Sequence, residues 1–194
     1  MKTWIQKLVL FGLATAVTAF STAVIAAEFN AEVGFRQQSG DGGTGFNSKS
    51  EVGYQLGMTG NFDINGPLMF RTGLLYTQRP LTIELTSSAA SSAKVSLTYF
   101  DVPLTLMYKF EDYGGAYAGI IAAVNLDKNY SGTGTLAGGT VTNAKSMITP
   151  FILGAAFKFA PGMGVNIYFE SGGDVSDTLK SYRAVGANFM LSFD

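Results

Sequence analysis

The residues of this chain that could do chemistry are charged side chains set into otherwise apolar segments. Each directly follows an apolar or aromatic residue, and the set contains four acids and four bases: Glu32, Arg36, Arg71, Asp101, Lys109, Asp127, Lys158 and Glu170. Charges persist in a protein interior when they are paired and hydrogen-bonded, so a neutral set predicts a mutually satisfied network. The same set could instead line a proton- or ion-conducting lumen or a binding pocket.

Catalysis is not expected from these residues. The chain contains no histidine and no cysteine, which excludes Ser-His-Asp hydrolysis, histidine-ligated zinc, thiol nucleophiles and disulfides. Asp174 and Asp177 could act as an acid–base pair, but acids in a Gly/Ser/Asp loop are typical of solvated turns. Asp41 and its neighbouring glycines lack the ligand spacing of an EF-hand. We therefore predict a non-enzymatic protein with no metal site and no cofactor.

The elements that must position these charges are strands, because apolar residues recur at every second position rather than with a helical period. Eight such segments can be counted, about as long as tilted strands need to be to cross a bilayer. An even number of strands can close into a ring, which leaves no backbone group unpaired in lipid. The segments cover residues 29–36, 52–62, 68–77, 100–110, 118–127, 151–159, 165–170 and 185–193.

The connections between these segments alternate in length. Three are tight turns, at residues 63–66, 111–115 and 160–163, and four are longer, at residues 37–49, 80–98, 128–146 and 172–181. Short periplasmic turns and long extracellular loops are typical of outer-membrane barrels. The prediction is an all-β, eight-stranded, antiparallel up-and-down transmembrane barrel, with both termini in the periplasm. An eight-stranded barrel has an interior that side chains can fill, so we predict no wide pore.

Aromatic residues gather where a barrel would meet the lipid headgroups. Six lie on the apolar face near the short-turn end and form a predicted girdle: Phe29, Phe62, Phe70, Phe110, Phe159 and Phe193. Tyr54, Tyr76 and Tyr182 are predicted at the other rim. The alternating Phe189, Leu191 and Phe193 match the terminal strand that the barrel assembly machinery recognises, although Asp194 follows the last aromatic residue.

The N-terminus predicts export. Lys2 and Lys7 precede an apolar run that ends in small residues near Ala26 and Ala27, so residues 1–27 are predicted as a cleaved signal peptide and residues 28–194 as the barrel. An uncleaved transmembrane helix is the alternative. Without the two lysines, 11 basic residues remain against 14 acidic ones, a net charge of −3. The chain has no basic patch for nucleic acid.

The connection at residues 80–98 has a pattern of its own. Its apolar residues switch from even to odd positions after Pro80 and back again near Phe100. This predicts a two-stranded ribbon above the membrane, with its tip near residues 89–90, residue 80 opposite about residue 99, and a bulge or twist at its base. The ribbon could offer an exposed edge to a protein partner, or it could simply cap the barrel mouth.

The segment Tyr99–Phe110, with its Phe-Asp-Val-Pro-Leu run, and the following Gly115–Ile120 resemble the PorT-type outer-membrane barrel family. OmpX- and OmpA-type barrels are the related architectures. The resemblance implies a Gram-negative outer-membrane location, with lipid around the barrel, and it implies no catalytic residue. The predicted function is a structural anchor or a surface interaction through the loops. A narrow porin-like channel and a soluble lipocalin-like barrel with an apolar interior remain alternatives.

Overall fold

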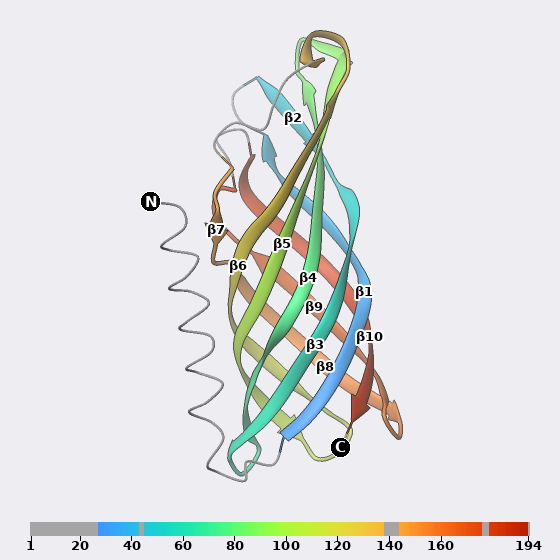
Figure 1. Ribbon diagram of the computed structural model, residues 1–194, viewed down its shortest axis with the longest axis vertical. Coiled ribbons are helices and arrows are strands. Elements are labelled where there is room, and N and C mark those ends of the chain that lie inside the picture. Colours follow the sequence, from blue (N-terminus) through green and yellow to red (C-terminus); the bar gives the residue numbers. More distant parts are fainter. Residues whose placement is uncertain (1–26, 43–44, 138–143, 176–178, 194) are drawn as a thin grey trace.

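The computed structural model describes residues 27–42, 45–137, 144–175 and 179–193, so the predicted signal peptide lies outside the described residues except for Ala27. Within these ranges the chain forms a closed antiparallel ring (Figure 1). Eight long strands make the ring in sequence order, and β1 pairs with β10 to close it. The eight-stranded up-and-down topology is therefore confirmed. The strands are β1 (Ala27–Gly42), β3 (Glu51–Asn65), β4 (Leu68–Leu85), β5 (Ser88–Phe110), β6 (Gly114–Gly132), β8 (Phe151–Ala160), β9 (Met163–Ser171) and β10 (Leu179–Phe193).

Three short elements accompany the ring. They are β2 (Phe46–Lys49), β7 (Met147–Ile148) and the 3-10 turn η1 (Gly134–Leu136). None of the described residues belongs to a helix with the length and hydropathy needed to cross a membrane.

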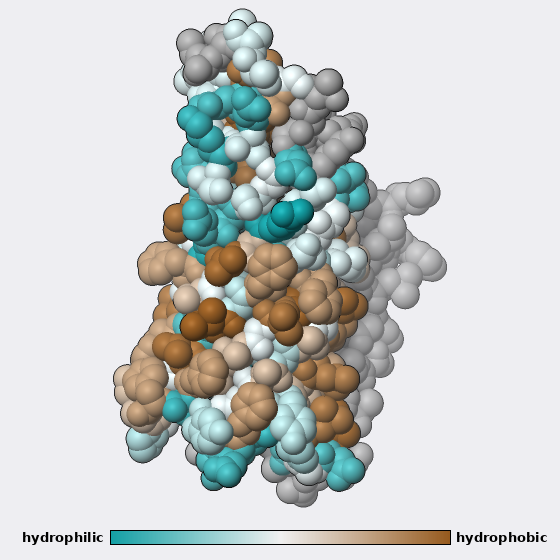
Figure 2. Space-filling view, turned by 180° about the vertical axis from the view of Figure 1, so that it is seen from behind, coloured by the Kyte–Doolittle hydropathy of each residue, from teal (hydrophilic) through white to brown (hydrophobic). Residues whose placement is uncertain are grey.

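The apolar face of each strand points outward. On β3, Val52 and Met58 are more than half exposed, whereas Gln55 and Thr59 are buried inside the ring. Figure 2 shows apolar residues gathered in a belt across the lower part of this face of the molecule, with polar residues above and below it. The lipocalin-like alternative is therefore wrong, because that arrangement requires the apolar side chains to point inward.

The height of the belt suits a lipid bilayer. On β5 the outward apolar residues run from Phe100 to Phe110, a stretch of eleven residues. A tilted transmembrane strand needs about 9–11 residues. The three predicted tight turns lie at residues 66–67, 111–113 and 161–162, all at the lower end in Figure 1, where the described chain also begins and ends.

The tall side of the barrel is built by β4, β5 and β6, which continue above the belt (Figure 1). We call this part the extension; it comprises residues 46–49, 77–85, 88–99 and 127–132. β4 and β5 form a hairpin as predicted, but its tip is at residues 86–87 and Pro80 pairs with Ser96. The predicted tip and register were wrong by about three residues.

The hairpin has no free edge along most of its length. β2 pairs with β4 at Phe46↔Leu85, and β6 pairs with β5 as far as Ala93↔Gly132. The predicted bulge lies on the neighbouring strand, where Leu126 is the extra residue of β6 beside Thr98 and Tyr99. The odd-numbered residues of β4 and β5 face inward both within the belt and above it. The switch in their sequence pattern therefore comes from a change in surroundings, because lipid no longer covers the outer face above the belt.

Ring closure depends on a close approach between the first and last strands. Gly34 on β1 faces Asn188 on β10, and a Cβ at Gly34 would lie 2.1 Å from the Ala187 carbonyl oxygen and 2.3 Å from Asn188 Oδ1. Both contacts are far closer than atoms tolerate, and the first is with backbone that cannot rotate away.

We therefore expect Gly34→Val to prevent closure, seen as loss of the faster-migrating unboiled band in gel electrophoresis of refolded protein. Ala31→Val on the same strand points toward lipid and should retain that band. Equal heat shifts in the two variants would contradict the role of Gly34.

Candidate functional site in the barrel lumen

An upper cluster of ionic groups fills the lumen near the top of the belt. Arg36 donates two hydrogen bonds to Glu170, at 3.0 and 2.7 Å, and Arg79 donates two to Asp101, at 2.9 and 2.7 Å. The two pairs are joined, since Arg79 Nη2 also lies 3.4 Å from Glu170 Oε2. The Tyr182 hydroxyl donates to Glu170 and accepts from Arg36 Nη2 at 2.6 Å. All five side chains are almost fully buried.

A lower cluster surrounds Glu32. Its carboxylate accepts hydrogen bonds from Thr59 at 2.6 Å, from Asn166 and Asn188 at 2.9 Å each, and from the paired Arg71. The donors come from four different strands, β3, β4, β9 and β10, so this one carboxylate ties together much of the ring.

Aromatic rings and one amide connect the clusters. The Arg71 guanidinium lies 4.6 Å from the centroid of Tyr117, and that of Arg79 lies 4.7 Å from Tyr99, distances at which a cation is attracted to a ring face. Gln55 Oε1 accepts from Tyr168 in the upper layer at 2.8 Å and from Asn188 in the lower layer at 3.2 Å. The Tyr168 ring in turn lies 6.0 Å from the Arg36 guanidinium, so hydrogen bonds and this cation–ring contact together link the two clusters.

Each cluster is electrically neutral. The upper one holds two arginines and two carboxylates, and the lower one holds Arg71 and Glu32. A buried charge without a partner is very costly, whereas pairing and hydrogen bonding make it tolerable.

Above the upper cluster, apolar side chains close the lumen. These residues form the apolar cap, and they come from the inner face of the extension and from the segments beside it: Leu81, Ile83, Val95, Leu97, Ile121, Ile148 and Val175. All are buried. Lys145 N–H donates to the Val175 carbonyl at 2.9 Å and Ile121 N–H to that of Pro150, so backbone hydrogen bonds hold the segments beside the ring in place.

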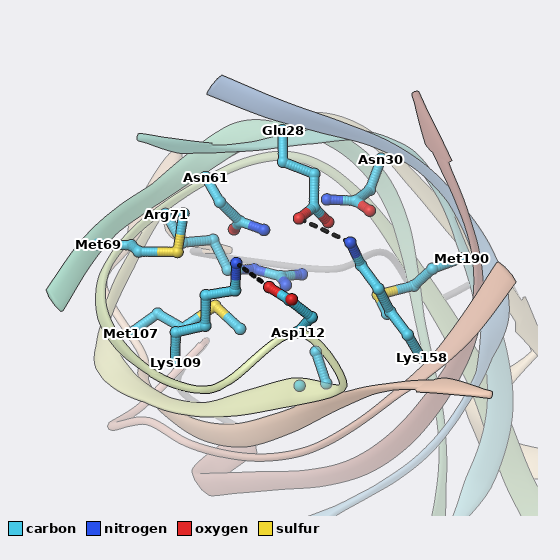
Figure 3. A pocket seen from close by; sticks show the side chains of 12 residues that line it. Glu28, Asn30, Asn61, Met69, Arg71, Met107, Lys109, Asp112, Lys158 and Met190 are labelled. Atoms are coloured by element: carbon cyan, nitrogen blue, oxygen red, sulfur yellow. Dashed lines mark ion pairs between the residues drawn. The ribbon is translucent and has the colours of Figure 1, made fainter. Parts of the chain in front are cut away.

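The lower end of the lumen is a polar mouth (Figure 3). Lys109 and Lys158 reach into it from β5 and β8, the two strands that flank β6, and pair with Asp112 at 3.1 Å and Glu28 at 2.8 Å. Both lysine side chains are about one-third exposed. The two predicted lysines therefore face inward but lie apart from the central clusters.

Of the eight predicted charges, the structure brings Glu32 and Arg71 together in one cluster and Arg36, Asp101 and Glu170 in the other. The prediction for Asp127 was wrong, since this residue is exposed on the extension. The bulge at Leu126 is the physical reason: the extra residue turns the following side chains of β6 to the opposite face.

The predicted girdle residues lie on the outer surface at the lower rim. Phe29, Phe110, Phe159 and Phe193 are exposed, and Phe62 and Phe70 are half-buried. Phe29 and Phe62 pack edge to face with centroids 6.0 Å apart. Of the three tyrosines predicted at the upper rim, Tyr54 and Tyr76 stack there, but Tyr182 points into the upper cluster. On β10, Phe189 is half-buried and Leu191 and Phe193 are exposed.

The sequence analysis missed Arg79, which falls between the predicted strand at residues 68–77 and the predicted connection at residues 80–98. A signal was available, because Arg79 shares the inward odd-numbered face of β4 with Arg71 and Thr77. Tyr99 and Tyr117, whose rings contact the arginines, could not be singled out in this way. The sequence pattern can predict that such a tyrosine points into the lumen, but not which cation its ring contacts.

Comparison with known proteins agrees with this geometry. The profile of a family described as outer membrane protein beta-barrel domain matches residues 19–181. The crystal structure of Neisserial surface protein A has the same fold, with 13% identity, a TM-score of 0.51, and coverage of 88% of this chain and 100% of that chain. Ail of Yersinia pestis is 12% identical, with a TM-score of 0.45 and coverage of 85% and 99%. OprG of Pseudomonas aeruginosa is 11% identical, with a TM-score of 0.44 and coverage of 87% and 94%. No curated protein sequence matches the chain.

The upper cluster generates a stability prediction. Glu170→Gln leaves two buried arginines with one carboxylate, and breaking such a buried pair costs about 3–5 kcal/mol. We expect a large decrease in the urea midpoint for loss of the fast-migrating folded band in detergent micelles. Glu84→Gln removes the partner of the exposed Lys49, at 2.7 Å, and should cost no more than about 1 kcal/mol. Similar midpoints for both variants would show that the upper cluster does not stabilise the barrel.

Proposed function

Because the chain belongs to the outer membrane protein beta-barrel family and lies in the cell outer membrane, we propose that it is a non-enzymatic anchor that presents its extension to a partner outside the cell. Its belt is in contact with outer-membrane lipid, its short turns face the periplasm, and its extension faces outward. The observation that carries the proposal is the extension, which is a packed and braced body rather than a set of loops.

The bracing of the extension is specific. Thr82 Oγ1 donates to Glu51 at 2.6 Å, and Lys94 pairs with the same carboxylate at 3.3 Å, which ties the hairpin to β3. Near the tip, Thr133 N–H donates to the Ser92 carbonyl at 2.7 Å, and Thr135 donates to Ser91 Oγ through both its N–H and its hydroxyl. A surface fixed before binding loses little conformational entropy when a partner docks.

The alternatives are less well supported. A channel would have to pass two neutral ionic clusters and the apolar cap, and all three are formed by buried side chains. The sequence holds no histidine and no cysteine for the common nucleophilic mechanisms. The buried carboxylates are already occupied by arginines, so they are poor candidates for acid–base chemistry.

Three finer assignments belong to the proposal. The closer kinship with PorT-type barrels rests on the segment Tyr99–Phe110, and export rests on the predicted signal peptide at residues 1–27. Recognition by the barrel assembly machinery would use the outward-facing Phe189, Leu191 and Phe193 of the closing strand.

The channel alternative can be tested directly. We expect the purified barrel to give no stepwise conductance in planar lipid bilayers under conditions where a general porin gives clear steps. The physical reason is that an ion would have to displace buried arginine–carboxylate pairs. Reproducible steps from the wild-type protein would contradict the sealed lumen and favour a narrow channel.

Partner binding can be tested by shortening the hairpin. Replacing residues 83–93 with Asn-Gly joins Thr82 to Lys94, which already face each other, through a two-residue turn. We expect expressing cells to lose most of their attachment to immobilised polysaccharides, proteins or neighbouring cells, relative to cells with the intact chain. The heat-shifted band must persist, and Lys128→Ala serves as the control with an intact tip. Unchanged attachment by the shortened barrel would exclude recognition through the hairpin tip.

A further inference from the structure

The mouth at the periplasmic end is a pocket rich in charged side chains. Its interior space is about 20 Å³ and opens to solvent, and it is lined by three cations, Arg71, Lys109 and Lys158, and by two carboxylates, Glu28 and Asp112. The cations converge from three strands, β4, β5 and β8 (Figure 3). This end of the lumen is thus open to the periplasm, whereas the opposite end is closed by the apolar cap.

Arg71 presents an unused hydrogen-bond donor to this pocket. Its Nη2 pairs with Glu32, but its Nη1 has no hydrogen-bond partner among the described residues, although the side chain is only 3% exposed. The Tyr117 ring and Glu32 hold the guanidinium from behind. A buried donor without a partner is costly, so a ligand oxygen there would be favourable.

Lys109 can turn to a ligand at little cost. The side chain of Asp112, which holds Lys109, is fully exposed on a short turn. Exposed ion pairs of this kind contribute little to stability. An external carboxylate or phosphate could therefore replace Asp112 on Lys109 without a large loss.

The remaining walls are apolar and adaptable. Met69, Met107 and Met190 line the pocket, and each is at least 95% buried. Methionine side chains have three rotatable bonds and a polarisable sulfur, so they fit a range of apolar shapes. A ligand with a short apolar part would contact them while its charged end meets the cations.

We propose that this mouth binds a small organic oxyanion, a carboxylate or a phosphate, that reaches it from the periplasm. The oxyanion lies between Arg71 Nη1 and the two lysine ammonium groups, and the organic part lies against the methionines. The site is separate from the extension, so a test of anion binding is independent of partner binding outside the cell.

The six methionines of the described barrel provide the test. Met69, Met107 and Met190 line the pocket, whereas Met58, Met147 and Met163 are exposed on the outer surface and serve as internal controls. The barrel, labelled with ¹³C-methyl methionine in detergent micelles, is titrated with inorganic phosphate, acetate or hexanoate at constant ionic strength. We expect saturable shifts of the three pocket methyl signals only. Tighter binding of hexanoate than of acetate indicates a carboxylate ligand with an apolar part, and preference for phosphate indicates a phosphate ester.

Variants then assign the site. Lys109→Ala combined with Lys158→Ala should weaken binding at least tenfold, and Arg71→Lys, which keeps the charge beside Glu32 but removes Nη1, should weaken it several-fold. Lys49→Ala combined with Lys94→Ala removes two paired lysines from the extension and should have no effect. The heat-shifted band verifies folding of each variant. The proposal is overturned if no anion gives saturable shifts, if the control methyl signals shift equally, or if the mouth variants bind as the wild type does.

Discussion

The whole structure depends on neutral pairing of charges inside a narrow ring wrapped in lipid. Eight strands leave an interior about as wide as the side chains that fill it, and the belt outside excludes water from the barrel wall. Three arginines and three carboxylates share this space in two neutral clusters. Glu32 alone receives donors from four strands, so the clusters also hold the strands in register. Replacing one of these charges affects the ring as a unit.

A second consequence of lipid is the exchange of faces at the upper rim. Within the belt, β4 buries Arg71 and exposes Leu74, whereas above the belt the same inward face carries Leu81 and Ile83. The backbone keeps its register across this boundary. Only the surroundings of the outer face change, from hydrocarbon to water. Above the belt the apolar residues therefore occupy the inner face, where water does not reach them. The extension thereby gains an apolar inner face, and that face becomes the cap of the lumen.

The sequence was sufficient for the features that repeat. Alternation, the three tight turns and the aromatic residues at the lower rim follow from a period of two and a bilayer of fixed thickness. The sequence was insufficient where a single extra residue reverses the alternation of a strand. The extra Leu126 reverses the faces of β6 and moves Asp127 outside, and nothing in the local pattern distinguishes a bulge from a regular strand. The hairpin tip was misplaced because Thr86-Ser87 is a weaker turn signal than the small residues that follow it. Arg79 was missed because the change in apolar pattern resembled the end of a strand.

The two ends of the lumen differ in the side chains that line them. The outer end is closed by tightly packed apolar side chains that need no ligand, and its polar groups brace the extension. The periplasmic end keeps an unpartnered arginine nitrogen and two lysines held by partly or fully exposed carboxylates. The two ends thus offer a ligand different surroundings, apolar at the outer end and ionic at the periplasmic end. A ligand that enters from the periplasm would therefore meet the two lysines and the Arg71 nitrogen before the buried clusters, as the proposed anion site requires.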